Sequence, residues 1–542
     1  MVPLDSEIRF ATALVIDGND ASRSALVNML REFGLAEVTQ ARRAQDARRL
    51  LEQQRFDIVV CEYEFEGEPV SGQDLMDDLR LAKLLPLATV VVMISAEAGH
   101  AKVAEAAEAA LDAYLIKPHT AEALRQRLLE ARKRKRALKD VFALIDKQAY
   151  VEAAEMCQAR FEVRGQAWLQ AARVGAELWL RLGKPHAAQR MFDAILEIGA
   201  VPWARLGVAR SQYDSGGTSQ ARRSLESLLN EQPGYSDAYD VMARVLLDQG
   251  LPDEALAASR EALSITPGSV SRLVKHGLLA FYYGDPGEAG AALARAARFG
   301  LGSKVFDLQG LVLLGLVQFD KGDLRGLAQS WRSMTVARAA ARGSDRLRRF
   351  EAVLSVMKSL LERNVTDAVA QTRDQIRESR DPSFELEAAC NLLALLSRLT
   401  RHELRLEGLD QDVLVLAQRF AVSRTTCELL TKSLQADLSL AAIVRDAYAA
   451  ICAEAEVAVS NTLNGLPGEA AKVLLVRAES TLNAKLMDLA IHTMDRHGQN
   501  IDGVEVLRER AAALHMRYRS YGTQVHLGRG DDKSALTRLA KL

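Results

Sequence analysis

The sequence predicts an α/β domain with a five-stranded parallel sheet, followed by an all-α array of repeated helix pairs. Residues 12–137 alternate short apolar segments with amphipathic helical segments. From residue 149 onward, apolar residues follow helical spacing, and glycines recur at a nearly constant interval. We therefore divide the chain into an α/β domain over 1–137, a repeat region over 138–345 and a further helical region over 346–542.

The composition is that of a globular protein with several domains. With 542 residues, the chain exceeds the size of one ordinary core. Hydrophobic residues make up 49% and charged residues 26%, whereas aromatic residues at 5% are scarce, which favours helix over sheet. The formal net charge of −1 creates no global field toward nucleic acid or an anionic membrane, so we expect neither as a partner.

The sequence carries no pattern for export, membrane insertion or a metal centre. The five cysteines lie far apart without a CxxC motif or paired Cys/His spacing, so neither a disulfide framework nor a zinc site is expected. The longest apolar stretches, around "LVLLGLV" and "LATVVVMI", are shorter than the roughly 18 residues that cross a bilayer. The first residues, "MVPLDSEIRF", have acids where a signal peptide has Lys or Arg. We expect a cytoplasmic protein without membrane insertion.

Four apolar runs of strand length define the predicted sheet. A helix between the first two runs is predicted to be capped by Asn19 or Asp20 and stopped by Gly34. Continuous apolar strands separated by helical patterns imply a parallel sheet covered on both faces. The runs are "TALVI" (12–16), "DIVVC" (57–61), "TVVVMI" (89–94) and "AYLI" (113–116).

Polar residues follow each of these runs directly. In an open parallel sheet, ligands bind just past the carboxyl ends of the strands. The side chains there belong to Asp17, Glu62, Ser95 and Lys117. We therefore expect these four residues to form one site.

The segments "LVID", "FDIVVCE", "VMISA" and "AYLIKP", in this order, resemble the receiver domain of bacterial response regulators. The resemblance implies a flavodoxin-like fold in which an aspartate after the third strand accepts a phosphoryl group from a histidine kinase. Two acids after the first strand hold Mg²⁺, a Thr or Ser senses the phosphoryl group, and a Lys pairs with it. Asp17, Ser95, Lys117 and the switch aromatic, Tyr114, match this pattern.

Two positions depart from the pattern. Glu62 stands at the acceptor position, and Gly18 stands where the second metal-binding acid belongs. Mg²⁺ demands near-octahedral oxygen ligands, and Gly18 supplies no side-chain oxygen. The extra methylene of Glu62 moves its carboxylate, and a misplacement of about 1 Å can cost about 100-fold in rate. Asp20 is either a helix cap or a substitute ligand. We expect no catalytic residue, no cofactor and no metal, with Asp17 as the remaining candidate ligand.

Three interpretations of Glu62 stay open. Its charge of about −1, against −1.5 to −2 for a phosphate, can pair with Lys117 and mimic an activated receiver. Alternatively, Glu62 neutralises Lys117 in an inactive pocket. In the third interpretation Mg²⁺ binds with a substituted ligand and Glu62 is still phosphorylated.

The basic segment "ARKRKRALK" (131–139) extends the last helix of this domain. Its cations permit contacts with phosphates. No interleaved aromatic residues or recognition helix accompany it. We therefore expect a solvated helical connector.

The repeat region shows a period of 34 residues. The segments "WARLG" (203–207), "YDVMA" (239–243) and "LVKHG" (273–277) place large, apolar and small residues at like offsets. This pattern resembles the tetratricopeptide (TPR) repeat, with small residues where two helices cross closely, and about six units are expected. Gly465 and Ala470 suggest one more pair. The recurring residues are Gly183, Gly216, Gly250 and Gly284, each followed five positions later by Ala188, Ala221, Ala255 or Ala289, with Ala154 in an earlier unit.

The chain lacks the motifs of the common enzyme classes. No "GxxxxGK[ST]", "HExxH" or "GxSxG" sequence is present, so we expect no enzymatic activity. A receiver joined to TPRs without a DNA-binding output resembles the VieB-like accessory response regulators. This implies a non-catalytic regulator of two-component phosphorelay signalling, a pseudo-receiver that binds a histidine kinase or another response regulator. A TPR groove takes a helix or extended peptide.

Two other functions remain open at this level. One is a phosphorylatable response regulator whose TPR region is the output. The other is an adaptor or assembly scaffold outside signalling that uses the receiver fold only for docking.

Overall fold

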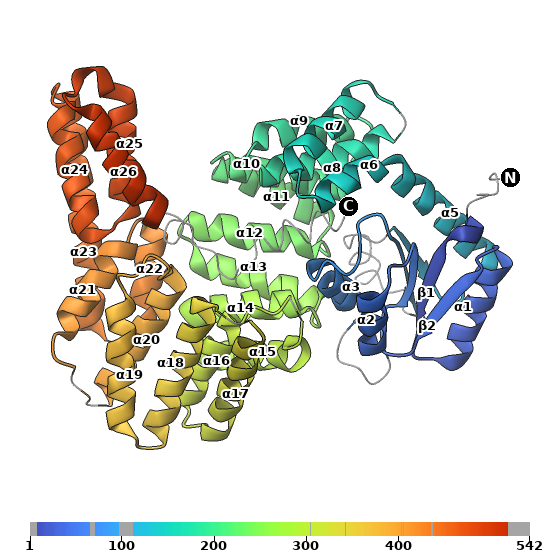
Figure 1. Cartoon of the computed structure of the whole chain (residues 1–542), viewed down its shortest axis with the longest axis horizontal. Coiled ribbons are helices and arrows are strands. Elements are labelled where there is room, and N and C mark those ends of the chain that lie inside the picture. Colours follow the sequence, from blue (N-terminus) through green and yellow to red (C-terminus); the bar gives the residue numbers. More distant parts are fainter. Residues whose placement is uncertain are drawn as a thin grey trace. The chain divides into compact units, whose positions relative to one another are not determined.

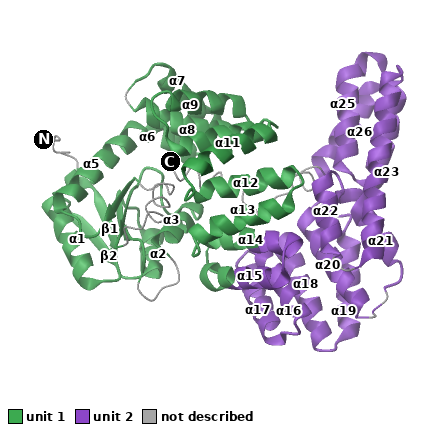
Figure 2. Cartoon of the chain, turned by 180° about the vertical axis from the view of Figure 1, so that it is seen from behind, with its two compact units in different colours: residues 1–276, 295–306, 529–542 green, residues 277–294, 307–528 purple. Residues whose placement is uncertain are grey.

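The computed structural model of the chain contains a parallel sheet followed by a long series of helices (Figure 1). It describes residues 8–65, 71–96, 112–165, 167–303, 305–341, 343–402, 404, 406–434 and 437–518. Contacts divide the chain into two compact units, coloured separately in Figure 2. The first contains residues 1–276 and 295–306, and the second contains 277–294 and 307–528. The domain boundaries at 137 and 345 stay predictions, because these units are groups of residues in contact and each joins separate segments of the sequence.

The predicted five-stranded parallel sheet is confirmed. Its order is β2-β1-β3-β4-β5, and every adjacent pair is parallel. The sequence runs located four of the strands to within one residue but not β2, which is polar and only half buried at the edge of the sheet. The strands are β1 (Thr12–Ile16), β2 (Glu37–Ala41), β3 (Ile58–Glu62), β4 (Val90–Ser95) and β5 (Ala113–Ile116).

Helices cover both faces of the sheet. The core on one face includes α1 (Asp20–Glu32) and α5 (Ala121–Ala137), and the core on the other includes α2 (Ala44–Gln53) and α3 (Gly72–Leu81). Asn19, not Asp20, caps α1, because its side chain accepts a hydrogen bond from the backbone N–H of Ser22. This arrangement explains why the central strands are apolar on both sides.

The first series of helices confirms the predicted period. Helices α8, α10, α12 and α14 begin at residues 168, 202, 236 and 270, so each starts 34 residues after the previous one. This is the period of the TPR repeat, two antiparallel helices per unit. The helices are α6 (Lys139–Asp146), α7 (Tyr150–Glu162), α8 (Trp168–Arg181), α9 (Pro185–Leu196), α10 (Pro202–Asp214), α11 (Thr218–Glu231), α12 (Ser236–Asp248), α13 (Pro252–Ile265), α14 (Val270–Tyr283) and α15 (Pro286–Gly300).

The second series keeps paired helices but loses the constant period. Helix α23 is 26 residues long, nearly twice the usual length. No helix in the described ranges combines the length and apolar character needed to cross a bilayer. The helices are α16 (Gln309–Asp320), α17 (Leu324–Ala340), α18 (Asp345–Leu361), α19 (Val365–Glu378), α20 (Leu386–Arg401), α21 (Leu409–Phe420), α22 (Arg424–Ser433), α23 (Leu438–Leu463), α24 (Pro467–Thr481), α25 (Ala484–His497) and α26 (Val504–Tyr518).

Small residues mark the helix crossings, as predicted. The recurring alanines are all fully buried, with no solvent exposure at Ala154, Ala188, Ala221, Ala255, Ala289 and Ala470. The alignment of "WARLG" was wrong by two residues. The residue equivalent to Ala243 is Ala209, 34 positions earlier and also fully buried. Gly207 instead faces the ring of Phe192, a buried residue of the preceding helix, α9.

The expectation of a solvated connector at 131–139 is wrong for two of its cations. Lys135 is only 6% exposed and Arg132 only 7%. The Lys135 ammonium lies 3.2 Å from a carboxylate oxygen of Asp112 and 5.1 Å from the ring centroid of Phe142 in α6. Helical periodicity turns these side chains inward, and Asp112 compensates the buried charge. The segment is thus the covalent link between the α/β domain and the first helix pair, and its side chains also contact both of them.

Replacing Gly207 by alanine tests the close helix crossing. A Cβ at this position would lie 2.5 Å from the Phe192 ring, so Gly207→Ala should destabilise the α9–α10 pair by roughly 1 to 3 kcal/mol. Hydrogen exchange of peptides from these two helices measures the effect locally. A local measurement is needed because a chain with two units does not have a single free energy of unfolding. The control is Gly234→Ala, where the added Cβ meets nothing within 4 Å. Equal exchange in both variants would contradict the close approach.

Candidate functional site

The four residues predicted to form one site lie together at the carboxyl edge of the sheet. Asp17 follows β1, Glu62 ends β3, Ser95 ends β4 and Lys117 follows β5. Asp17, Glu62 and Ser95 are buried, with exposures of 1%, 8% and 2%. Parallel pairing of the central strands aligns their ends, which is why residues up to 100 positions apart meet here.

The ammonium of Lys117 connects the two carboxylates. Its Nζ donates a hydrogen bond to Oε2 of Glu62 and another, at 3.2 Å, to Oδ2 of Asp17. One cation therefore pairs with both buried acids. The pairing of Glu62 with Lys117 that the sequence suggested is present.

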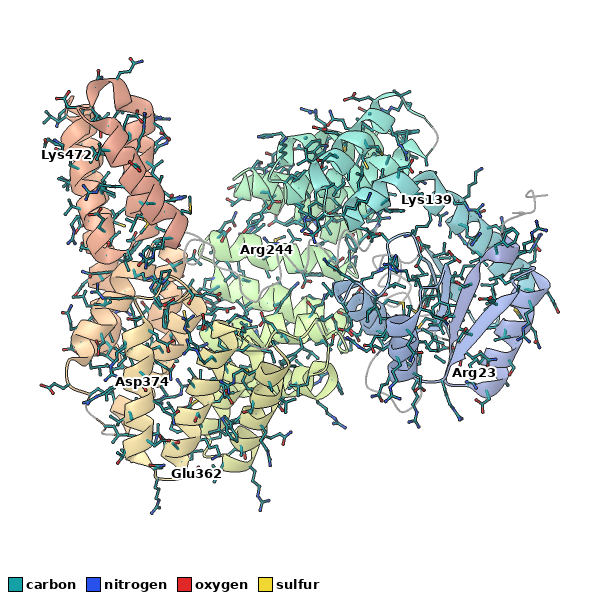
Figure 3. The ribbon with its side chains drawn as sticks, viewed as in Figure 1. Arg23, Lys139, Arg244, Glu362, Asp374 and Lys472 are labelled. Carbon is teal, nitrogen blue, oxygen red and sulfur yellow. The ribbon has the colours of Figure 1, made fainter. Side chains whose placement is uncertain are left out.

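The start of α1 orients Asp17. Its Oδ1 accepts the backbone N–H of Asn19 at 2.8 Å, and its Oδ2 accepts the hydroxyl of Ser22 at 2.6 Å. Arg23, labelled in Figure 3, donates to the backbone carbonyl of Asp17 at 2.7 Å. Sequence reasoning missed Ser22 and Arg23. Their position in the first turn of a helix that follows the site strand was the available signal.

Gly18 leaves space rather than a ligand. A Cβ built there would meet only the backbone carbonyl of Arg42, at 3.8 Å, which is an ordinary contact. The next acidic side chain along the chain, that of Asp20, is 64% exposed and pairs with Arg23 and Arg42. The hydrogen bond from Arg23 lowers the pKa of Asp20. Asp20 is therefore neither the helix cap nor directed at Asp17.

The residues present do not fit Mg²⁺. The ion needs several oxygen ligands at about 2.0 to 2.1 Å in octahedral geometry. Gly18 has no side-chain oxygen, and the carboxylates of Asp17 and Glu62 share a lysine ammonium. Among the residues that the structure describes, no group of three His, Cys, Asp or Glu side chains is placed to hold a metal ion.

Tyr114, the predicted switch aromatic, lies on β5. Its half-buried ring packs against the core on the α2 and α3 face of the sheet. The ring therefore contributes to the packing of the domain, and its role as a switch stays a prediction. Residues 66–70, in the segment that follows β3, lie outside the described residues.

Burial changes the protonation of Glu62. It raises the pKa of Glu62 to about 7, an effect that the Lys117 hydrogen bond partly offsets and the neighbouring charge of Asp17 reinforces. Burial lowers the pKa of Lys117, but its pairing with Glu62 and Asp17 outweighs this, so the net shift is upward. Near neutral pH, Lys117 is charged, while Glu62 exchanges between its neutral and charged forms.

Glu62→Gln should remove a pH dependence of stability. Between its ordinary value of 4.5 and about 7, folded Glu62 holds a proton that the unfolded chain releases, so stability falls as pH rises through this window. The melting temperatures of the wild-type and Glu62→Gln chains are measured at pH 5.5 and at pH 8. Only the wild type should lose stability between these pH values, so the variant should be more stable relative to the wild type at pH 8 than at pH 5.5. The exposed Glu32→Gln is the control. A difference independent of pH would argue against the raised pKa.

Comparison with known proteins agrees with the geometry of the first domain. Residues 13–129 match the family model of the response regulator receiver domain. The chemotaxis protein CheY-3 of Vibrio cholerae is 33% identical over 118 residues, which are 21% of this chain and 86% of that protein. The chemotaxis protein CheY of Pseudomonas aeruginosa is 30% identical over 118 residues, 21% of this chain and 90% of that protein.

Solved structures resemble separate parts of the chain. A response regulator receiver domain protein of Clostridium thermocellum, 24% identical, covers 24% of this chain and 98% of its own, with a TM-score of 0.21. A tetratricopeptide repeat protein of Parabacteroides merdae, 14% identical, covers 49% of this chain and 99% of its own, with a TM-score of 0.34. Through residues 13–129, the chain belongs to the response regulator receiver domain family.

Proposed function

We propose that this chain is a non-catalytic regulator of two-component signalling that acts by binding other proteins. The receiver domain indicates such signalling, and TPR-like helix pairs are typical of protein-binding regions. The observation that carries the proposal is the pairing of Lys117 with both Glu62 and Asp17. In this view the receiver is a pseudo-receiver that keeps its fold without phosphoryl transfer.

The pocket disfavours phosphorylation for two reasons. The carboxylate that would attack a phosphoryl group, that of Glu62, already accepts a hydrogen bond from Lys117. Gly18 offers no acid to anchor a metal ion, and in phosphoryl transfer such ions neutralise the charge that develops on the phosphoryl oxygens. The chain then needs no cofactor and no enzymatic activity of its own.

The same pair supplies a moderate bias toward an activated shape. Desolvation offsets most of the attraction between Glu62 and Lys117, as for buried ion pairs in general. A net gain of about 1 to 2 kcal/mol shifts a two-state equilibrium about tenfold, whereas complete switching needs about 5.5 kcal/mol. The partial protonation of Glu62 near pH 7 reduces the bias further. The receiver is therefore biased and not locked.

The helix pairs supply the second binding surface. Helices α8, α10 and α12 are neighbours, and ion pairs such as Arg210 with Glu177 at 2.6 Å connect successive units. Arrays of this kind bind a helix or an extended peptide. We propose a histidine kinase or another response regulator in the cytoplasm as the partner, in the manner of the VieB-like accessory regulators.

Restoring the two missing carboxylate positions should restore phosphorylation. Wild-type protein incubated with acetyl phosphate and Mg²⁺ should show no gain of mass, whereas the Gly18→Asp, Glu62→Asp double variant should gain one phosphoryl group. The structure accommodates the first change, because a Cβ at Gly18 meets only one atom, at 3.8 Å. Intact-mass spectrometry measures the result, with Gly18→Asp alone as the control. A wild-type gain that Glu62→Gln abolishes would instead identify a phosphorylatable regulator.

Glu62→Ala should weaken partner binding without unfolding the receiver. Purified histidine kinases and response regulators of the source bacterium form the binding panel, and phosphotransfer between each kinase and its regulator is measured with and without this chain. We expect the variant to lose up to about tenfold in affinity, the size of the bias that Glu62 supplies.

The matched control is Glu32→Ala, at the end of α1 remote from the pocket. Unchanged regulation in Glu62→Ala would favour the inactive pocket. Failure of every kinase and regulator to bind, with capture of secretion, pilus or protease components instead, would favour the scaffold function.

A further inference from the structure

A cluster of nucleophilic side chains lies in the second unit, far along the chain from the receiver pocket. Cys452 and Tyr448 lie one turn apart on α23, Lys485 is on α25, and Cys427 is on α22. Cys452 is partly exposed, whereas the other four cysteines of the chain are buried. It is therefore the one cysteine thiol within reach of solutes.

Lys485 makes an unusual set of contacts. Its ammonium nitrogen lies 3.3 Å from the sulfur of Cys452 and 5.7 Å from the ring centroid of Tyr448. Among the described residues, no carboxylate forms an ion pair with Lys485, whereas Lys275, Lys358 and Lys472 each pair with an acid. The half-buried ammonium therefore places a charged hydrogen-bond donor beside the sulfur, and reactive cysteines lie in electropositive, partly exposed surroundings of this kind.

The other groups around the sulfur leave this effect in place. Tyr448 hydrogen-bonds with Cys452, and burial raises the pKa of its phenol to about 12, so it stays neutral. Burial likewise raises the pKa of the Cys427 thiol, which adds no charge at neutral pH. Arg424 and Glu428 pair with each other at 3.1 Å, and Arg445 adds a second positive charge near Cys427. The surroundings are therefore neutral to positive.

We propose that Cys452, whose sulfur lies beside the Lys485 ammonium, is a reactive cysteine and a site of modification by hydroperoxides. In the reaction, the thiolate sulfur attacks one oxygen of hydrogen peroxide, the O–O bond breaks, and hydroxide leaves. The sulfur is oxidised by two electrons to a sulfenic acid, and the peroxide is reduced. The site is independent of the receiver pocket and of the proposed partner.

The first test traps the product in the full-length chain. Hydrogen peroxide at pH 7 in the presence of dimedone should label Cys452 ahead of the other four cysteines, as located by peptide mass spectrometry, and Cys452→Ser should lose the label. Lys485→Met should slow labelling about tenfold, the effect of one pKa unit on the thiolate fraction. The control is Lys472→Met on neighbouring α24 (Figure 3), whose ammonium pairs with Glu469 instead.

The second test separates charge stabilisation from simple exposure. Alkylation of Cys452 by iodoacetamide as a function of pH should have a midpoint below about 8.5, the value of a free thiol. Lys485→Met should move the midpoint to 8.5 or above, and Lys485→Arg, which keeps a cation, should restore most of the reactivity. A wild-type midpoint at or above 8.5, or a midpoint that Lys485→Met leaves unchanged, would overturn the proposal. This holds even if Lys485→Met slows labelling in the first test, because a disturbed packing of α25 could have that effect as well.

Discussion

The receiver pocket depends on one ammonium group shared by two buried carboxylates. Lys117 carries one positive charge and pairs with both Asp17 and Glu62. The backbone N–H of Asn19 and the hydroxyl of Ser22 stabilise the charge on Asp17. Burial raises the pKa of Glu62 to about 7, and the neighbouring charge of Asp17 adds to this shift. The pocket therefore holds one cation, two buried acids and, near neutral pH, a partly protonated Glu62.

The two departures from the receiver pattern compensate each other. A receiver with two acids after the first strand and one after the third relies on a divalent cation to balance three negative charges. Without that cation, one lysine cannot offset three buried carboxylates. Gly18 removes one of these charges, and the longer side chain of Glu62 pairs with Lys117 directly. The two changes together leave two carboxylates, instead of three, beside one lysine.

The helical part of the chain depends on close approach rather than on charge. Alanine at each recurring crossing has no exposed surface, and glycine at 207 admits the ring of Phe192. Each helix pair buries its apolar face only against the next pair, so the packing propagates along the array. Where the constant period ends, the helices keep pairing but vary in length, as α23 shows.

The sequence by itself determined the elements with local signals. Apolar runs located four strands, and the spacing of glycine and alanine identified the helix pairs, because burial on a sheet or at a crossing constrains residues at fixed intervals. The rule that sites lie past the carboxyl ends of parallel strands then implied that Asp17, Glu62, Ser95 and Lys117 would meet. Only the tertiary structure decided what depends on distance and burial. It joined Lys117 to both acids, turned Lys135 inward, made polar β2 an edge strand and placed Lys485 beside Cys452. These contacts join residues far apart in the chain, and their strength comes from the removal of water, which no local pattern records.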